Sequence, residues 1–276
     1  MTINCHGTLV DLSSPKVMGI LNVTPNSFFD GGKYGDEKSM LSQAEKMLAE
    51  GATFIDIGAY SSKPSAEFVS EDEEIERLVP MVKSVLQSFP NALISVDTFR
   101  ANVAKAAVEN GACIINDIAA GSLDDKMIST VAELQVPYIM MHMKGNPQTM
   151  QGSAHYENVT KEILFYFSEK IAQARSLGIN DLIVDPGFGF AKSLEQNFEV
   201  MDNLELFQTL ELPLLVGVSR KSMVYKTLET TPEFALNGTS VLNTIALQKG
   251  ANILRVHDVK EALECVKLYN SLSPQN

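Results

Sequence analysis

Eight short apolar runs recur along the chain, and this recurrence limits the possible folds more than any other feature. The runs are rich in valine and isoleucine, which is typical of parallel strands that are covered on both faces. Between them, apolar residues recur at helical spacing, as in Met40, Ala44 and Met47, which predicts amphipathic helices. The predicted strands cover residues 17–23, 53–58, 93–97, 113–118, 137–142, 181–185, 213–217 and 252–257.

Eight strands that are each followed by a helix are typical of a (β/α)8 TIM barrel, a fold of the α/β class. An open, doubly wound sheet is the alternative that the same pattern allows. The length of 276 residues suits one barrel, and no change in composition marks a second domain. We therefore expect a single TIM-barrel domain over residues 1–276, with the barrel itself over about 17–271.

The charge and the cysteines of the chain argue against several classes of function. A formal net charge of −12 disfavours binding to nucleic acid or to an anionic membrane surface. The three cysteines, Cys5, Cys113 and Cys265, fit neither a zinc site nor a disulfide framework. The sequence has no signal-peptide pattern and no apolar run long enough to span a membrane, so we expect a cytoplasmic protein without a membrane partner.

Polar and charged residues stand at or near the C-terminal ends of the predicted strands. In a (β/α)8 barrel these ends form one rim, where the active sites of this fold lie. A turn or a helix cap would explain any one of these residues, but not a whole ring of them. The sequence therefore predicts a site at this rim. The ring consists of Asn22, Asp56, Asp97, Asn116, His142, Asp185, Lys221, Arg255 and His257.

Two of the predicted loops indicate what the site would bind. The loop over residues 185–192 carries Phe188 and Phe190, separated by Gly189, and such rings can lie against a flat molecule, although core packing would explain them equally well. The loop over residues 217–223 places Lys221 at a predicted helix start, where N–H groups and a cation attract anions; a solvated surface lysine is the alternative.

Arg255 and His257 are two residues apart on a predicted strand, so their side chains point the same way. In a closed barrel this strand lies beside the one that ends at Asn22. The three residues together predict a pocket for a diphosphate.

Seven segments of the chain resemble, in order, the successive signatures of the dihydropteroate synthase family. They extend from residue 17 to about residue 260. The segments are MGILNVTPNSFFDGG, FIDIGAYSSKP, SVDTFR, IINDIAAG, LIVDPGFGFAK, GVSRKSM and LRVHDV. The resemblance implies a TIM-barrel transferase, commonly a homodimer and a target of sulfonamide drugs. Such an enzyme condenses 6-hydroxymethyl-7,8-dihydropterin pyrophosphate with p-aminobenzoate to give 7,8-dihydropteroate and diphosphate in folate biosynthesis.

The resemblance also implies a role for each matching residue. Asn22 would bind a Mg2+ ion that holds the diphosphate, and Arg255 and His257, with Lys63, would donate hydrogen bonds to the diphosphate. The pterin would be bound by Asp97, Asn116, Asp185 and Lys221. The p-aminobenzoate would be surrounded by Ser62, Pro64, Phe190 and Ser222. The residues expected to take part in catalysis are Asp97, Lys221, Arg255 and His257.

A dissociative reaction follows from the same resemblance: diphosphate leaves first, and the amine attacks the pterin cation that remains. An ionised Asp97 would stabilise that cation. Because the nitrogen of an aromatic amine is barely basic, we expect no general base.

Some positions depart from the commonest family pattern. Asn26 stands where many members carry Asp, and Ala191 stands where Gly is common. Residues 59–65 read AYSSKPS where GESTRPG is usual. Lys63 stands in place of Arg and cannot make the bidentate contact with an anion that a guanidinium makes. The affinity for p-aminobenzoate and the sensitivity to sulfonamides are therefore in doubt. The residues concerned are Tyr60, Ser62, Lys63 and Ser65.

Three other interpretations remain. One is a methyltransferase that passes a methyl group from methyltetrahydrofolate to a corrinoid, which shares the barrel but has no use for a diphosphate pocket. Another is a Schiff-base aldolase with Lys221 as the nucleophile. The third is an inactive paralogue that still binds pterin.

Overall fold

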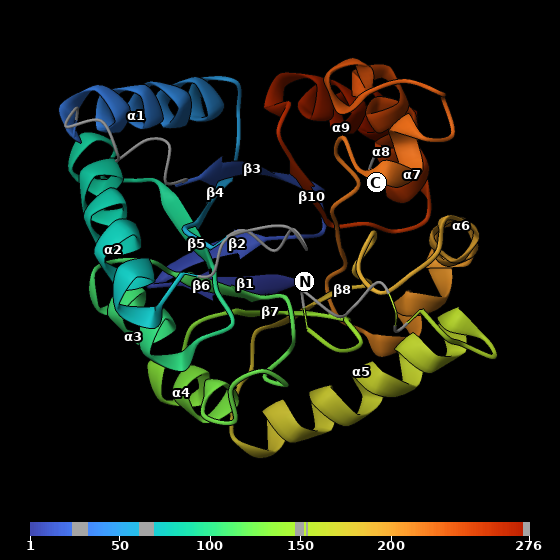
Figure 1. Cartoon of the computed structure of the whole chain (residues 1–276), viewed down its shortest axis with the longest axis horizontal. Coiled ribbons are helices and arrows are strands. Elements are labelled where there is room, and N and C mark those ends of the chain that lie inside the picture. The colour runs from blue at the N-terminus through green and yellow to red at the C-terminus, as the bar shows by residue number, and fades with distance from the viewer. Residues whose placement is uncertain (24–32, 61–68, 147–151, 153, 273–276) are drawn as a thin grey trace.

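A computed structural model describes residues 1–23, 33–60, 69–146, 152 and 154–272 of the chain. Its main feature is a sheet of eight parallel strands in the order β8-β7-β6-β5-β4-β3-β10-β9. A bridge between Val184 of β8 and Leu214, just before β9, brings the two ends of the sheet together. The result is a nearly closed barrel surrounded by helices, as Figure 1 shows. This confirms the predicted (β/α)8 fold and rules out the open, doubly wound sheet.

All eight predicted apolar runs form strands of the barrel. Seven of them agree with the prediction to within one residue at each end, whereas β9 is only two residues long where the prediction covered residues 213–217. Pro213 has no N–H group, and the N–H of Leu214 donates to the side-chain oxygen of Asn252 at 2.9 Å instead of to a strand. The strands are β3 (Lys16–Asn22), β4 (Phe54–Gly58), β5 (Leu93–Asp97), β6 (Ile114–Asp117), β7 (Tyr138–Met141), β8 (Leu182–Asp185), β9 (Leu215–Val216) and β10 (Ile253–Val256).

Helices follow the strands and form the outer layer. The α-helices are α1 (Lys33–Ala49), α2 (Glu71–Ser88), α3 (Ala101–Glu109), α4 (Met127–Leu134), α5 (Val159–Ser176), α6 (Leu194–Asp202), α7 (Ser222–Tyr225), α8 (Leu236–Gln248) and α9 (Val259–Leu272). Two 3-10 helices, η3 (Leu204–Leu210) and η4 (Pro232–Phe234), lie beside β9 and α8 in the chain. No helix in the described ranges is long and apolar enough to cross a membrane.

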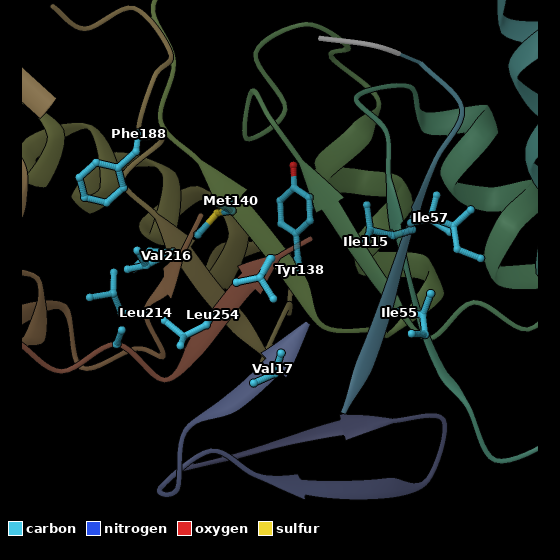
Figure 2. Packing of buried hydrophobic residues seen from close by; sticks show 14 of the residues in the cluster. Val17, Ile55, Ile57, Ile115, Tyr138, Met140, Phe188, Leu214, Val216 and Leu254 are labelled. Atoms are coloured by element: carbon cyan, nitrogen blue, oxygen red, sulfur yellow. The ribbon is translucent and has the colours of Figure 1, made fainter. Parts of the chain in front are cut away.

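The apolar core lies between the strands and the helices. Outward-facing strand residues such as Ile55, Tyr138 and Val216 are fully buried there, as Figure 2 shows. Burying one such side chain stabilises the fold by roughly 1.5–3 kcal/mol. Because every second residue of a strand faces outward into this core, the residues between them must face the inside of the barrel.

A hairpin that the sequence did not predict closes the floor of the barrel. Its antiparallel strands are β1 (Thr2–Cys5) and β2 (Thr8–Asp11). The buried side chains of Ile3 and Val10 pack against the lowest inward-facing layer of the barrel. That layer consists of Met18, Phe54, Ile114, Ile139, Ile183, Leu215 and Ile253. The hairpin therefore seals the N-terminal end and leaves the C-terminal end of the strands for a site.

Candidate functional site

Inside the barrel, the layer of side chains directly above the apolar floor is mostly polar. The alternation that points Phe54, Ile114 and Ile253 inward also points the residues two positions later inward. Strand register places Asp97 beside Gly58 on one side and Asn116 on the other. Adding a Cβ atom at Gly58 would bring it within 3.3 Å of the Asp97 Cβ, so the glycine leaves room for the carboxylate. The polar layer is made of Asp56, Ser95, Asn116, Asp185 and Arg255.

Arg255 links two carboxylates across the inside of the barrel. Its Nε donates to Asp56 Oδ2 at 2.6 Å, and its Nη2 donates to Asp97 Oδ2 at 2.7 Å. Asn116 Nδ2 also donates to Asp56 Oδ2, at 3.0 Å. The other oxygen of Asp56 is buried and has no hydrogen bond to the described residues. Nη1 of Arg255 has no hydrogen bond to the described residues, so it could donate to a ligand.

The ion pair changes the acidity of its members. Burial raises the pKa of the Asp97 carboxyl to about 7, although the neighbouring Arg255 favours the ionised form. Burial alone would lower the pKa of Arg255, but Asp56 and Asp97 raise it above its usual value. The guanidinium therefore stays charged, while Asp97 can exist in either protonation state near neutral pH.

A second pair consists of Asp185, the last residue of β8, and Lys221, on the loop after β9. One oxygen of Asp185 accepts the N–H of Gly187 at 2.8 Å. Lys221 Nζ donates to the carbonyl of Phe188 at 2.5 Å and lies 4.8 Å from the centre of the Phe190 ring. Burial lowers the pKa of Lys221 to about 8 and raises that of Asp185, and each group partly opposes the shift of the other. A flat ligand with donors and acceptors on one edge would find both kinds of partner here.

His257 and Asn22 lie at the rim. The Nδ1 atom of His257 is 3.0 Å from the hydroxyl of Ser219, which also accepts the backbone N–H of His257 at 3.2 Å. Desolvation in the barrel mouth, together with Arg255, lowers the pKa of His257 to about 4. The imidazole is therefore neutral at pH 7. Asn22 ends β3 with an exposed side chain.

The described residues include no group of three or more His, Cys, Asp or Glu side chains that could hold a metal ion. The amide oxygen of Asn22 is a hard ligand of the kind that Mg2+ accepts. Asn22 therefore suits a Mg2+ ion that has one ligand among the described residues and takes its other ligands from a phosphate and from water.

The structure brings most of the predicted site residues together. Lys221 immediately precedes α7, whose first residue is the half-buried Ser222. Phe190 lies in an apolar cluster with Met143 and Ala191. Asp97, Asn116 and Arg255 are linked through hydrogen bonds that include Asp56. Lys221 lies over Phe190 and interacts with the charge of Asp185, and His257 interacts with that of Arg255. Asn22 ends β3 and Ser222 begins α7.

One of the sequence expectations was wrong. The side chain of His142 points outward from the barrel and is buried against Tyr166 of α5, with ring centres 4.9 Å apart, so it does not belong to the ring at the rim. Of the two alternatives left open for Phe188, core packing is the one observed, because its side chain is fully buried. Ser62, with Lys63, Pro64, Ser65 and Asn26, lies outside the described residues.

Sequence reasoning also left some residues of the site without a role. Asp56 was recognised as a strand-end residue, but its contact with Arg255 follows only from the closure of the barrel. Its position two residues before Gly58, on the same face of the strand, could have shown that its side chain points into the barrel. Lys192 and Ser219 gave no signal of their own, because their partners come from other strands and loops.

Comparison with known proteins finds clear relatives of the chain. A family model described as pterin binding enzyme matches residues 18–257. The chain is similar to dihydropteroate synthase of Escherichia coli strain K12, with 43% identity over 270 residues, which cover 97% of this chain and 95% of the relative. The similarity to dihydropteroate synthase of Bacillus subtilis strain 168 is 41% over 258 residues, which cover 93% and 88%.

Solved structures give the same result. The crystal structure of Yersinia pestis dihydropteroate synthase with a sulfonamide drug complex has a TM-score of 0.93 and 41% identity, and the match covers 100% of both chains. Dihydropteroate synthase from Xanthomonas albilineans in complex with 7,8-dihydropteroate has a TM-score of 0.88 and 33% identity, again over 100% of both chains.

Proposed function

This chain belongs to the family of pterin-binding enzymes, and we propose that it is a transferase with dihydropteroate synthase activity. It would condense 6-hydroxymethyl-7,8-dihydropterin pyrophosphate with p-aminobenzoate and release diphosphate. The pair of carboxylates that Arg255 joins, with Asp185 and Lys221 in the same mouth, is the observation that carries the proposal. More specifically, we propose that the enzyme transfers an alkyl group, because the pterin methylene moves from an oxygen to a nitrogen.

The pterin ring would bind between the two polar pairs. A 2-amino-4-oxo pterin presents neighbouring N–H groups, and the carboxylate of Asp185 can accept two such hydrogen bonds. Lys221 would donate to a ring acceptor from the same side. Asp97 and Asn116, on adjacent strands, would complete the contacts to the ring edge.

The departing diphosphate would lie at the rim. Arg255 has Nη1 available, and the neutral His257 can donate from Nε2 while its Nδ1 contacts Ser219. Asn22 would hold a Mg2+ ion together with the diphosphate oxygens. When bound, the ion would neutralise charge that develops on the leaving group.

Asp97 would stabilise the positive charge that remains on the pterin after diphosphate leaves. A carboxylate in a partly buried site acts more strongly on such a charge than one in water does. The p-aminobenzoate would then approach past Phe190 and Ser222, with Ser62 as a further expected contact. Because its nitrogen is barely basic, the protein's contribution is positioning and electrostatics, and no residue serves as a strong base.

We also propose that the enzyme is a cytoplasmic homodimer. The three cysteines are free and buried, which is compatible with a reducing compartment. Exposed apolar side chains of Leu228, Phe234, Val241 and Leu268 occur on the contacting elements around α7, η4, α8 and α9. Light scattering on the purified protein would test the dimer, and a monomer at micromolar concentration would contradict it.

The lowered pKa of Lys221 is the one observation that favours the Schiff-base alternative, because an amine must be unprotonated to attack a carbonyl. We expect no adduct when the protein is treated with borohydride and a carbonyl substrate. A covalent adduct on Lys221 would support the alternative.

The test of the proposed function is turnover. Purified protein is incubated with Mg2+, the pterin pyrophosphate and p-aminobenzoate, and both diphosphate and 7,8-dihydropteroate are measured. We expect equal amounts of the two products and no diphosphate without the amine. Release that does not need the amine, or binding of pterin without any product, would overturn the proposal in favour of a hydrolase or an inactive paralogue.

A further inference from the structure

The loop between β8 and α6 is held by side chains that bind its carbonyl groups. The carbonyl of Phe188 accepts from Lys221 on one side of the loop, at 2.5 Å. The carbonyls of Gly187 and Phe190 accept from Lys192 Nζ on the other side, at 3.0 and 3.1 Å. The hydroxyl of Tyr156 donates to the carbonyl of Ala191 at 2.9 Å. The loop therefore depends on these donors, because little of its backbone pairs with other backbone.

Lys192 also reaches outside the loop. Its Nζ lies 3.1 Å from Nδ1 of His142, which follows β7 and is buried beneath α5. Burial, with Lys192 and Lys144 nearby, lowers the pKa of His142 to about 2, so the ring is neutral and its Nδ1 accepts from the ammonium. At Gly187 a Cβ atom would approach the carbonyl oxygen of His142 to 2.2 Å, so this end of the loop lies directly against β7. Lys192 thus ties the loop to a rigid strand.

We infer that Lys192 is a positioning residue of the active site: its ammonium fixes the loop over residues 186–192 and thereby sets Phe190 and Lys221 for the reaction. This inference rests on the proposed function. Lys192 touches neither of the expected substrate positions, so it acts through the loop. The carbonyl of Phe188 and the ring of Phe190 together fix the ammonium of Lys221.

The partners of Lys192 argue against a role in stability alone. No carboxylate in the described ranges lies within salt-bridge distance of its Nζ, and all three of its partners are neutral. Burial lowers the pKa of the Lys192 amino group to about 7, and the charge of Asp185 offsets only part of this effect. An apolar side chain could fill the same space at a lower cost in folding free energy. The amino group is therefore explained by the carbonyl groups that it holds in place.

Lys249 provides a matched control. Its Nζ donates to the carbonyl of Asp202, the last residue of α6, at 2.6 Å and to the carboxylate of Glu205 in η3 at 2.8 Å, so it too binds a backbone carbonyl. It lies just before β10 begins, at the end of the barrel opposite the mouth. Lys249→Met removes comparable hydrogen bonds far from the proposed site.

The experiment compares wild type, Lys192→Met, Lys192→Arg and Lys249→Met at a temperature at which each is folded by circular dichroism. We expect Lys192→Met to lower kcat and to raise the KM for p-aminobenzoate, through Phe190, and that for the pterin substrate, through Lys221, each about tenfold. Lys192→Arg, which keeps the charge and the donors, should recover most of the loss. Lys249→Met should lower the melting temperature and leave both KM values unchanged.

Hydrogen exchange supplies a readout that does not depend on activity. The amides of Gly189 and Phe190 bond to Asn197 Oδ1 at 2.7 Å and to the carbonyl of Gly187 at 3.1 Å, and both should exchange at least tenfold faster in Lys192→Met. If that variant does not fold, Lys192→Gln is used, and the same acceleration is expected. Unchanged exchange in a folded variant, or an equal rise in KM in Lys249→Met, overturns the inference. A wild type without synthase activity overturns the proposed function and leaves the exchange result to decide the role of Lys192.

Discussion

Arg255 keeps two carboxylates together inside the barrel at the place where a positive charge would form. In the free protein the guanidinium satisfies Asp97, and burial raises the pKa of that carboxyl to about 7. A diphosphate at the rim would draw Arg255 toward itself and weaken this pairing. Asp97 would then meet the pterin cation with less of its charge compensated, which is the condition under which a carboxylate stabilises a cation most.

We predict that Asp97→Asn lowers kcat/KM by a factor on the order of 10²–10³, as the loss of one preorganised charge does in other enzymes. The substitution keeps the shape of the side chain and removes its charge. Steady-state kinetics of diphosphate release measures the effect. Asp181→Asn, at the floor of the barrel, is the control and should keep wild-type kinetics, since among the described residues the hydrogen bond of its carboxylate is to the N–H of Asn4. Wild-type turnover in Asp97→Asn would remove the proposed role.

His142 gives a prediction about pH and stability. Its pKa in the folded protein is about 2, below the 6.5 of an ordinary histidine. Below pH 6.5 the unfolded chain therefore binds a proton that the folded chain does not, so stability falls as the pH falls. Between pH 7.5 and 5.5 wild type should lose about 1.4 kcal/mol more than His142→Gln, measured by urea unfolding. Parallel curves for the two proteins would show that His142 is protonated in the fold.

Single residues also show where prediction from sequence stopped. Asp56 and Asp97 could be placed at strand ends from the pattern alone, but the sharing of Arg255 between them depends on strands that meet only when the barrel closes. Ala191 was identified as a departure from a common glycine. The structure shows its consequence, a backbone φ of 48°, a conformation that a side chain disfavours.

At the scale of elements, the strands were predictable because each is a short apolar run covered on both faces. The glycines that end several helices were predictable too: Gly51, Gly111, Gly178 and Gly250 all have positive φ. The hairpin of β1 and β2 was not predictable, because its strands are only four residues long and five of their eight side chains are exposed. What makes it a stable element is the apolar floor of the barrel on which it packs, and no local pattern shows that floor.

The hairpin provides a prediction with an internal control. Ile3 is 2% exposed and packs into the floor, whereas Leu9, on the same hairpin, is 71% exposed. Ile3→Ala should lower the free energy of unfolding by about 2–4 kcal/mol, and Leu9→Ala should change it by less than about 0.5 kcal/mol. Chemical denaturation measures both. Equal effects would show that the hairpin does not plug the barrel, and an altered KM in Ile3→Ala would show that the floor and the mouth are coupled.

At the scale of the whole molecule, stability and chemistry occupy opposite ends of one barrel. The hairpin and the lowest layer close one end, and the polar layer with Arg255 opens toward the other. Sequence alone could predict this division, because a (β/α)8 fold always carries its sites on the same rim. It could not predict the depth of the mouth, which depends on the apolar layer that fills the barrel below.

This division makes the three cysteines dispensable for catalysis. Cys5 and Cys113 lie in the floor cluster, and Cys265 lies in α9 of the outer layer. We predict that Cys5→Ser, Cys113→Ser and Cys265→Ser each keep kcat/KM within about twofold of wild type, although a buried hydroxyl can cost roughly 1–2 kcal/mol of stability. Kinetics on the folded fraction tests this. Loss of activity in all three variants would indicate a thiol mechanism.

The bridge between Val184 and Leu214 has a mechanical consequence. Among the described strands, β8 and β9 are the neighbours joined by the fewest backbone hydrogen bonds, because β9 is two residues long. Asp185 and Lys221 stand on opposite sides of that junction. If the barrel widens at this junction, the two groups proposed to bind the pterin move apart. The flexibility of the barrel wall and the strength of pterin binding therefore depend on the same few hydrogen bonds.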